Sequence, residues 1–198
     1  MLSNRLYRDF IQSATQEVGL DNLPLILAGH PLLPALQETG PLIKLEGEQA
    51  EKANASLQQA LRLYYGHGAR GLLLRIGRGM WTRMISEANF LEKAELEISR
   101  WLPVPARRRH ILEVLTGRLR EAGGAASVYS LDLDLLLVDR CGAATLGQTS
   151  AEPVCFVTLG LIQGALYWAT GHEADVEEIS CKATGAPACE FKVKLGGE

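Results

Sequence analysis

The sequence lacks the patterns that mark several large classes of protein. It has 20 lysines and arginines against 23 aspartates and glutamates, so it has no basic excess of the kind that sequence-independent nucleic-acid binding requires. Residues 1–9 are charged and periodic, unlike the apolar core of a signal peptide. No G-x-G-x-x-G follows a predicted strand, and neither a P-loop nor a nucleophile elbow is present. We therefore expect a cytoplasmic protein without direct nucleic-acid contacts, and we favour a non-enzymatic role while leaving enzyme activity uncertain.

Long apolar runs are also missing, with one exception. Residues 154–170 contain no charged residue, but this length is marginal for crossing a bilayer, and Gln163 lies inside the run. Gly160 and Gly164 form a small-xxx-small pair. We predict a helix buried in a protein core, with glycines that allow close approach to a sheet, and no membrane span.

The hydrophobic period changes near Gly123 and Gly124. Before these glycines, the apolar residues recur at helical spacing. This spacing predicts helices behind Ser3, from about residue 22 to Gly29 or Pro31, and over about 50–66, 72–87, 90–100 and 103–120. After them, strands are predicted at 125–130 and 133–140, joined by a Leu131-Asp132 turn, and at 173–183 and 188–195. A helix opened by Pro153 and closed by Gly171 lies between the two pairs.

This order of elements predicts an α+β fold. We expect N-terminal helices packed on a C-terminal antiparallel sheet of about four strands with one inserted buried helix. Residues 1–66 would be an N-terminal helical extension that could mediate dimerisation.

Cysteine is scarce, and three of the four cysteines lie near the C-terminus together with one carboxylate: Cys155, Glu178, Cys181 and Cys189. Glu178 and Cys181 are three residues apart, so strict alternation along a strand would place them on opposite faces. A bulge, or a position at the end of the strand, is needed to bring both to one ion. Cys189 lies across a hairpin turn, and Cys155 lies in a first helical turn that favours a thiolate. Together these groups would form a closed tetrahedral zinc site, which is structural rather than catalytic.

Three other interpretations of these cysteines remain open. Cys181 and Cys189 could form a disulfide across the hairpin, although clustered cysteines in a reducing compartment are more often metal ligands or free thiols. All three could be buried free cysteines that pack as small hydrophobes. Cys141 could replace Glu178 as the fourth metal ligand.

The C-terminal segment resembles a known family. The residues that carry the resemblance are Pro153-Val154-Cys155-Phe156, Gly160, Gly164, Gly171, and Val176 to Val193 with its Glu178, Cys181, Gly185, Cys189 and Phe191. This pattern is similar to the 4-vinyl reductase domain family, also called the hydrocarbon-binding domain. Arg75-Ile76-Gly77-Arg78 also resembles the Arg/Gly-containing helix earlier in these domains. The resemblance implies the ligand-binding fold shared with the haem nitric-oxide-binding domain and a TRAPP subunit.

The resemblance also implies a site. In phenol-sensing bacterial activators, a domain of this kind holds zinc with three cysteines and one glutamate beside an apolar pocket for a small aromatic molecule. By motif position, the zinc ligands here would be Cys155, Glu178, Cys181 and Cys189. We expect residues 67–198 to form a 4-vinyl-reductase-like ligand-binding domain with its zinc motif at 155–189. Unlike the activators, the chain shows no ATPase module or helix-turn-helix, so a sensor would need a partner.

The function expected from this comparison is binding of a small apolar or aromatic molecule by a zinc-containing sensor or carrier, as a homodimer. One alternative is an accessory protein or reductase acting on the vinyl group of a bacteriochlorophyll or chlorophyll precursor. Such a reduction needs a hydride or electron donor, and the sequence shows no site for one. Another alternative is a dimeric scaffold with a vestigial pocket.

Ligand pockets are mostly apolar with a few polar anchors. The candidate pocket-lining residues are Trp81, Met84, Trp101, Ile111, Tyr129 and Trp168. Arg75, Arg78 and Arg83 could anchor a ligand carboxylate, although solvated arginines are the simpler interpretation.

Overall fold

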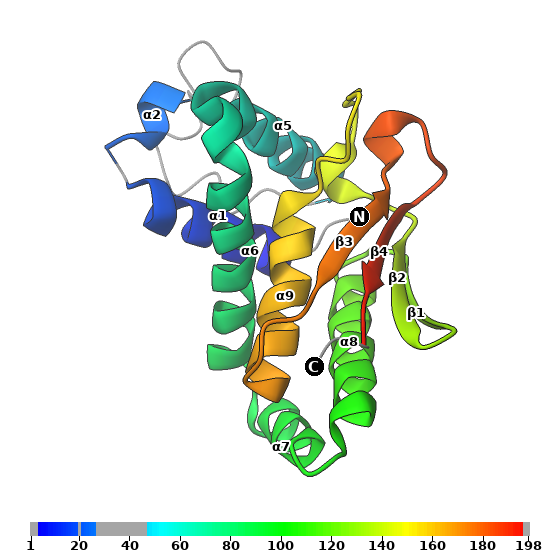
Figure 1. Cartoon of the computed structure of the whole chain (residues 1–198). Coiled ribbons are helices and arrows are strands. Elements are labelled where there is room, and N and C mark those ends of the chain that lie inside the picture. The colour runs from blue at the N-terminus through cyan, green and yellow to red at the C-terminus, as the bar shows by residue number, and fades with distance from the viewer. Residues whose placement is uncertain (1–3, 20, 27–46, 196–198) are drawn as a thin grey trace.

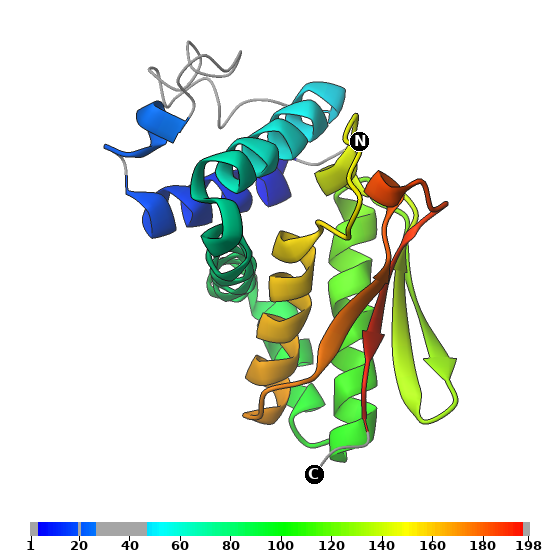
Figure 2. The same cartoon turned by 45° about the horizontal axis from the view of Figure 1, so that its top comes forward.

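The computed structural model describes residues 4–19, 21–26 and 47–195, and it confirms the α+β fold (Figures 1 and 2). The α-helices are α1 (Asn4–Val18), α2 (Leu23–Ile26), α5 (Gly47–Tyr65), α6 (Ala69–Ser86), α7 (Phe90–Ser99), α8 (Val104–Glu121) and α9 (Phe156–Thr170). Short 3-10 turns form η1 (Gly66–Gly68), η2 (Ala143–Thr145) and η3 (Lys182–Thr184). The strands are β1 (Ala126–Leu131), β2 (Asp134–Asp139), β3 (Val176–Ser180) and β4 (Cys189–Val193). The expected helix cap at Ser3 and the helix end at Gly29 or Pro31 lie outside the described residues.

The four strands form one antiparallel sheet in the order β1-β2-β4-β3, as the expected sheet of about four strands requires. Side chains alternate along β4, where Cys189, Phe191 and Val193 are buried while Glu190 and Lys192 are partly exposed. One face of the sheet therefore belongs to the core, and α8 and α9 pack against the sheet (Figure 2).

The first hairpin turns one residue later than predicted. Leu131 pairs with Asp134 as the last pair of β1 and β2, so the turn is formed by Asp132 and Leu133 rather than by Leu131 and Asp132. Asp132 has a φ of +51°, and aspartate tolerates this left-handed conformation better than leucine does. The Leu131-Asp132 assignment was wrong for this reason.

Helix α9 is the inserted buried helix, and it lies between α6 and the sheet (Figure 1). Its glycines face α6 rather than the sheet, which corrects the sequence-based expectation. A Cβ added at Gly160 would lie 2.1 Å from the carbonyl oxygen of Leu74, and one added at Gly77 would lie 2.1 Å from that of Val157. The two helices therefore pack so closely that only glycine fits at these positions. Within the described part of the chain, no helix is long and apolar enough to cross a membrane.

The N-terminal helices share the hydrophobic core with the rest of the chain. Tyr7 and Phe10 of α1 and Leu57 and Leu61 of α5 are almost fully buried, in the same cluster as the apolar residues of α6 and α9. The division of the chain at residue 66, and dimerisation through residues 1–66, stay predictions.

Candidate metal centre and ligand pocket

The end of strand β3 brings Glu178 and Cys181 to the same side. Glu178 pairs with Phe191 of β4, whereas Ser180 pairs with Glu190, so Ile179 is an extra residue in a bulge. Cys181 follows the last residue of β3 and precedes η3. The strands are shorter than predicted because η3 and the left-handed turn at Gly185 lie between them. The bulge and the strand end that the sequence required are thus both present.

Cys155, Glu178, Cys181 and Cys189 each contribute one potential ligand atom to a cluster in which all these atoms lie within 4.8 Å of one another. The Sγ atom of Cys155 lies 3.7 Å from that of Cys181 and 3.4 Å from that of Cys189. A tetrahedral zinc ion with Zn–S bonds of about 2.3 Å would hold its sulfurs about 3.8 Å apart. The spacing of the sulfurs therefore suits a zinc ion.

The structure bears on the other interpretations of the cysteines. All four cysteines are free thiols, so the structure contains no Cys181–Cys189 disulfide. Cys141 is exposed, its Sγ lies near the carbonyl oxygen of Gly123, and it is not part of the cluster, so it does not replace Glu178. Cys155 is at the N-cap of α9, one position before the helix. Buried free thiols remain compatible with this geometry.

Glu178 has one carboxylate oxygen that lacks a protein partner. Its Oε2 accepts a hydrogen bond from the backbone N–H of Cys155 at 2.9 Å, whereas Oε1 is buried without a hydrogen-bond partner. Burial raises the pKa of the Glu178 carboxyl to about 8. A buried carboxylate oriented through one oxygen and free at the other is suited to metal coordination, and the residues present fit zinc in this respect.

The three thiols share their protons. Hydrogen bonds from Cys155 and Cys189 lower the pKa of the Cys181 thiol, and the bonds of Cys155 to the same partners, together with burial, raise the pKa of Cys155. The backbone N–H of Lys182 also donates to Sγ of Cys189 at 3.4 Å. A bound zinc ion would take the place of the shared protons and would tie α9 to the β3–β4 hairpin.

Arg62 of α5 was not identified from the sequence, but it lies close enough to this cluster to interact with it electrostatically. Burial lowers the pKa of Arg62, while the charges of Cys155 and Cys181 act in the opposite direction. Its Nη2 donates to Gln148, whose Nε2 donates in turn to the carbonyl oxygens of Ala55 and Ala144. The guanidinium would offset part of the negative charge of a zinc site with three thiolates and a carboxylate. No local sequence signal marks Arg62, because α5 approaches the cluster only through the tertiary fold.

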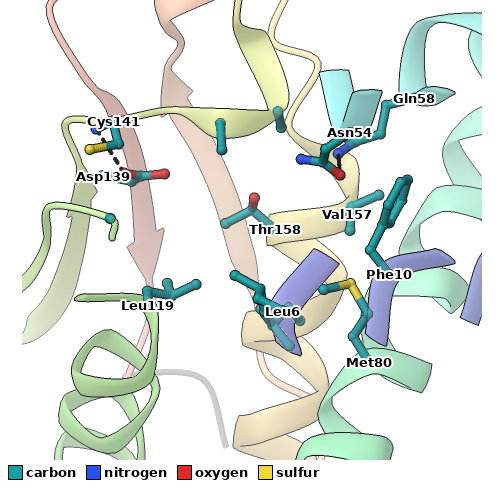
Figure 3. A pocket seen from close by; sticks show the side chains of 14 residues that line it. Leu6, Phe10, Asn54, Gln58, Met80, Leu119, Asp139, Cys141, Val157 and Thr158 are labelled. Carbon is teal, nitrogen blue, oxygen red and sulfur yellow. Dashed lines mark hydrogen bonds between the residues drawn. The ribbon is translucent and has the colours of Figure 1, made fainter. Parts of the chain in front are cut away.

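A cavity of about 70 Å³ lies between the N-terminal helices and the C-terminal half of the chain (Figure 3). Its apolar walls include Phe10 of α1, Met80 of α6 and Leu161 of α9. On one side, Gln58 Nε2 donates to Asn54 Oδ1 at 3.1 Å, and the Oε1 atom of Gln58 is buried without a partner. The cavity is completed by Leu6, Leu119, Gly124, Asp139, Cys141, Ala143, Ala144, Val157 and Thr158.

The six residues predicted to line a pocket do not line this cavity. Trp81 and Ile111 are buried in the core, and Trp81 packs edge-on against Trp168 with ring centroids 6.2 Å apart. Trp101 is 90% exposed, and Tyr129 is exposed on β1. Met84 lines a separate cavity near α8. Their role in ligand binding stays a prediction.

The three arginines considered as carboxylate anchors are already bonded to neighbouring side chains. Arg75 pairs with Glu17 at 2.8 Å and Arg78 with Glu173 at 2.8 Å. Arg83 donates to Gln16 at 2.9 Å and to Gln12. These bonds favour the simpler interpretation, in which the arginines are surface residues.

Comparison with known proteins agrees with the metal cluster and its surrounding hairpin. The family model of the 4-vinyl reductase domain matches residues 138–195. The chain contains a 4-vinyl reductase domain. This confirms the resemblance found in the sequence. No curated protein sequence matches the chain.

Solved structures share the fold of this domain and of the helices before it. An H-NOX protein from S. oneidensis in the Fe(II)NO ligation state aligns over 99% of this chain and 100% of its own, with a TM-score of 0.61 and 13% identity. The unliganded Fe(II) H-NOX protein from K. algicida aligns over 100% of this chain and 98% of its own, with a TM-score of 0.57 and 14% identity. The phenol-responsive sensory domain of the transcription activator PoxR, with phenol, aligns over 73% of each chain, with a TM-score of 0.53 and 17% identity. At these identities the alignments establish a fold like that of H-NOX and the PoxR sensory domain.

Proposed function

We propose that this protein is a small-molecule sensor or carrier that binds a compact apolar or aromatic ligand bearing one hydrogen-bond donor, and that a structural zinc ion stabilises it. The observation that carries the proposal is the unpartnered Oε1 of Gln58 in an otherwise mostly apolar cavity. The phenol bound to the PoxR sensory domain, which has the same fold, supports a ligand of this class.

The chemistry of the cavity favours a ligand with an O–H or N–H group. A buried acceptor without a partner costs about 1–3 kcal/mol, and a donor on the ligand would remove this cost. Phe10, Met80 and Leu161 would contact the apolar part of the ligand. A purely apolar molecule would gain the same contacts but would leave Gln58 unpaired.

The size of the cavity limits the ligand. Its volume of about 70 Å³ is roughly half of the 150 Å³ that accommodates benzene in an engineered cavity. A phenol-sized ligand therefore requires side chains to move, and Met80 is flexible enough to do so. The cavity is far too small for a tetrapyrrole, so it lends no support to the vinyl-reduction alternative. An existing cavity likewise favours ligand binding over a vestigial pocket.

The position of the cavity suggests how binding would be transmitted. It is walled by α1 and α5 on one side and by α9 and the residues after β2 on the other. A ligand that widens it would push these groups apart. Because zinc would fix the start of α9 to the β3–β4 hairpin, the displacement would fall mainly on α1 and α5.

A titration calorimetry experiment with phenol and toluene tests this proposal. Wild-type protein should bind phenol more tightly than toluene, by about tenfold if the hydrogen bond contributes about 1.4 kcal/mol. Gln58→Leu should abolish this preference. Gln59→Leu, at the exposed neighbouring position on α5, should preserve it. Equal binding of both compounds by wild type, or binding of neither, would overturn the proposal.

A further inference from the structure

Asp9 of α1 is the most unusual buried group outside the metal cluster. Its side chain is only 1% exposed, yet neither carboxylate oxygen has a hydrogen-bond partner. It lines a cavity of about 110 Å³ between α1 and α8, separate from the apolar cavity. The other charged residues that line this cavity are Arg5, Glu92, Arg118 and Glu121.

The arginines near Asp9 make their hydrogen bonds elsewhere. Arg5 donates to the carbonyl oxygen of Glu87 at 3.0 Å, and Arg8 pairs with the Glu87 carboxylate at 2.7 Å. Arg118 lies 4.0 Å from Glu92 and donates to the carbonyl oxygen of Met84. The carboxylate of Asp9 therefore faces the cavity without a protein donor. Leaving a buried carboxylate in this state is costly, and proteins normally pair such a group.

The charge and spacing of the lining groups indicate what could pair with Asp9. Three carboxylates and two guanidiniums line the cavity, so an anion would be repelled by the excess of negative charge. A single metal ion is also disfavoured. Among the described residues, the grouping of metal-ligand side chains close enough to hold one ion is the Cys155 cluster. A small organic cation can instead direct several N–H donors to separate carboxylates.

We propose that the cavity around Asp9 is a second binding site, for a small organic cation with N–H donors such as a primary alkylammonium. The ammonium would donate to the Oδ1 and Oδ2 atoms of Asp9, and Glu121 would add to the negative field. The volume of about 110 Å³ limits the ligand to a few non-hydrogen atoms. This site does not depend on zinc or on a ligand in the apolar cavity.

The test is a titration of the full-length protein with ethylammonium chloride, followed by backbone amide chemical shifts in NMR spectra. Sodium chloride at the same ionic strength controls for screening, and tetraethylammonium, which has no N–H donor, controls for charge alone. Ethylammonium should shift amides of α1 and α8 saturably, and the two controls should not.

Variants locate the site. Asp9→Asn should weaken ethylammonium binding by at least about tenfold. Glu121→Gln should weaken it less, and Glu97→Gln, at an exposed position on α7, should leave it unchanged. If Asp9→Asn does not fold, Glu121→Gln still reports on the site. The absence of saturable shifts in wild type, or equal binding by wild type and the Asp9 and Glu121 variants, would overturn the proposal and leave a cavity filled by water.

Discussion

The carboxylate of Glu178 is oriented by the backbone N–H of Cys155, a residue 23 positions earlier in the chain. This bond joins the N-terminus of α9 to strand β3 directly, before any metal binds. It leaves Oε1 of Glu178 buried and unpartnered beside three buried sulfurs. The arrangement is therefore prepared for a cation, and it leads to two predictions about metal content.

Purified protein should contain one zinc ion per chain, bound by the Cys155 cluster. Native mass spectrometry should show a zinc-sized mass that is lost on denaturation. Cys181→Ser should lose the metal and lower the melting temperature, because much of the zinc-binding free energy stabilises the fold. Cys141→Ser should retain it, since Cys141 lies outside the cluster. Metal-free protein with four free thiols would show instead that the three buried cysteines are core residues.

Glu178→Gln separates the charge of this side chain from its hydrogen bond. The amide oxygen of glutamine can still accept from the Cys155 N–H, so the local fold should persist. Loss of the anionic ligand should weaken zinc binding by at least about tenfold. Competition with a fluorescent zinc chelator measures the affinity. Glu177→Gln, at the exposed neighbouring position, is the matched control, and equal affinities for both variants would exclude Glu178 as a ligand.

Gly160→Ala should destabilise the fold strongly. Its Cβ would meet the backbone of Leu74 at 2.1 Å, and backbone atoms cannot give way as a flexible side chain can. Separating α6 from α9 should cost at least about 2–3 kcal/mol of unfolding free energy, measured by chemical denaturation. Gly71→Ala on α6 meets only the end of Arg75 at 3.8 Å, so it should be neutral or stabilising by up to about 1 kcal/mol. Similar losses for both variants would contradict this explanation of the helix contact.

The same contact shows how far the sequence determined the structure. Hydrophobic periodicity located the described helices and the four strands, because burial of apolar faces follows local spacing. The spacing of Glu178 and Cys181 predicted the bulge, because alternation along a strand is a strict geometric rule. The glycines of α9 signalled a close approach, but the partner was wrong, since α6 is brought to α9 only by tertiary packing.

The apolar cavity could not be predicted for a similar reason. Its walls come from α1, α5, α6, α8 and α9, and its free acceptor, Gln58, is on the face of an ordinary amphipathic helix. The sequence suggested aromatic residues as pocket lining, yet Trp81 is buried in the core and Trp101 projects into solvent. Nothing in the local sequence distinguishes these cases. Arg62 and Asp9 were missed because their neighbours are distant in the chain.

The stability of the protein should depend on the ionisation of Asp9. The pKa of Asp9 is raised from 3.8 to about 6, mainly by burial and also by the charge of Glu87, against the opposing charges of Arg8, Arg5 and Arg83. Because the folded-state pKa is above the unfolded value, the folded state is favoured while Asp9 is protonated. This contribution is complete below about pH 3.8 and is lost as the pH rises through about 6.

Asp9→Asn removes this ionisation and isolates its effect from those of the other carboxylates. Without added cation, the variant should be more stable than wild type above about pH 7, by about 1–3 kcal/mol, and the difference should vanish near pH 4. Chemical denaturation of both proteins at a series of pH values measures it. Saturating ethylammonium should narrow the difference at neutral pH, because the cation stabilises only the ionised carboxylate of wild type. A difference that is independent of pH would mean that Asp9 is neutral or paired in the folded protein throughout this range.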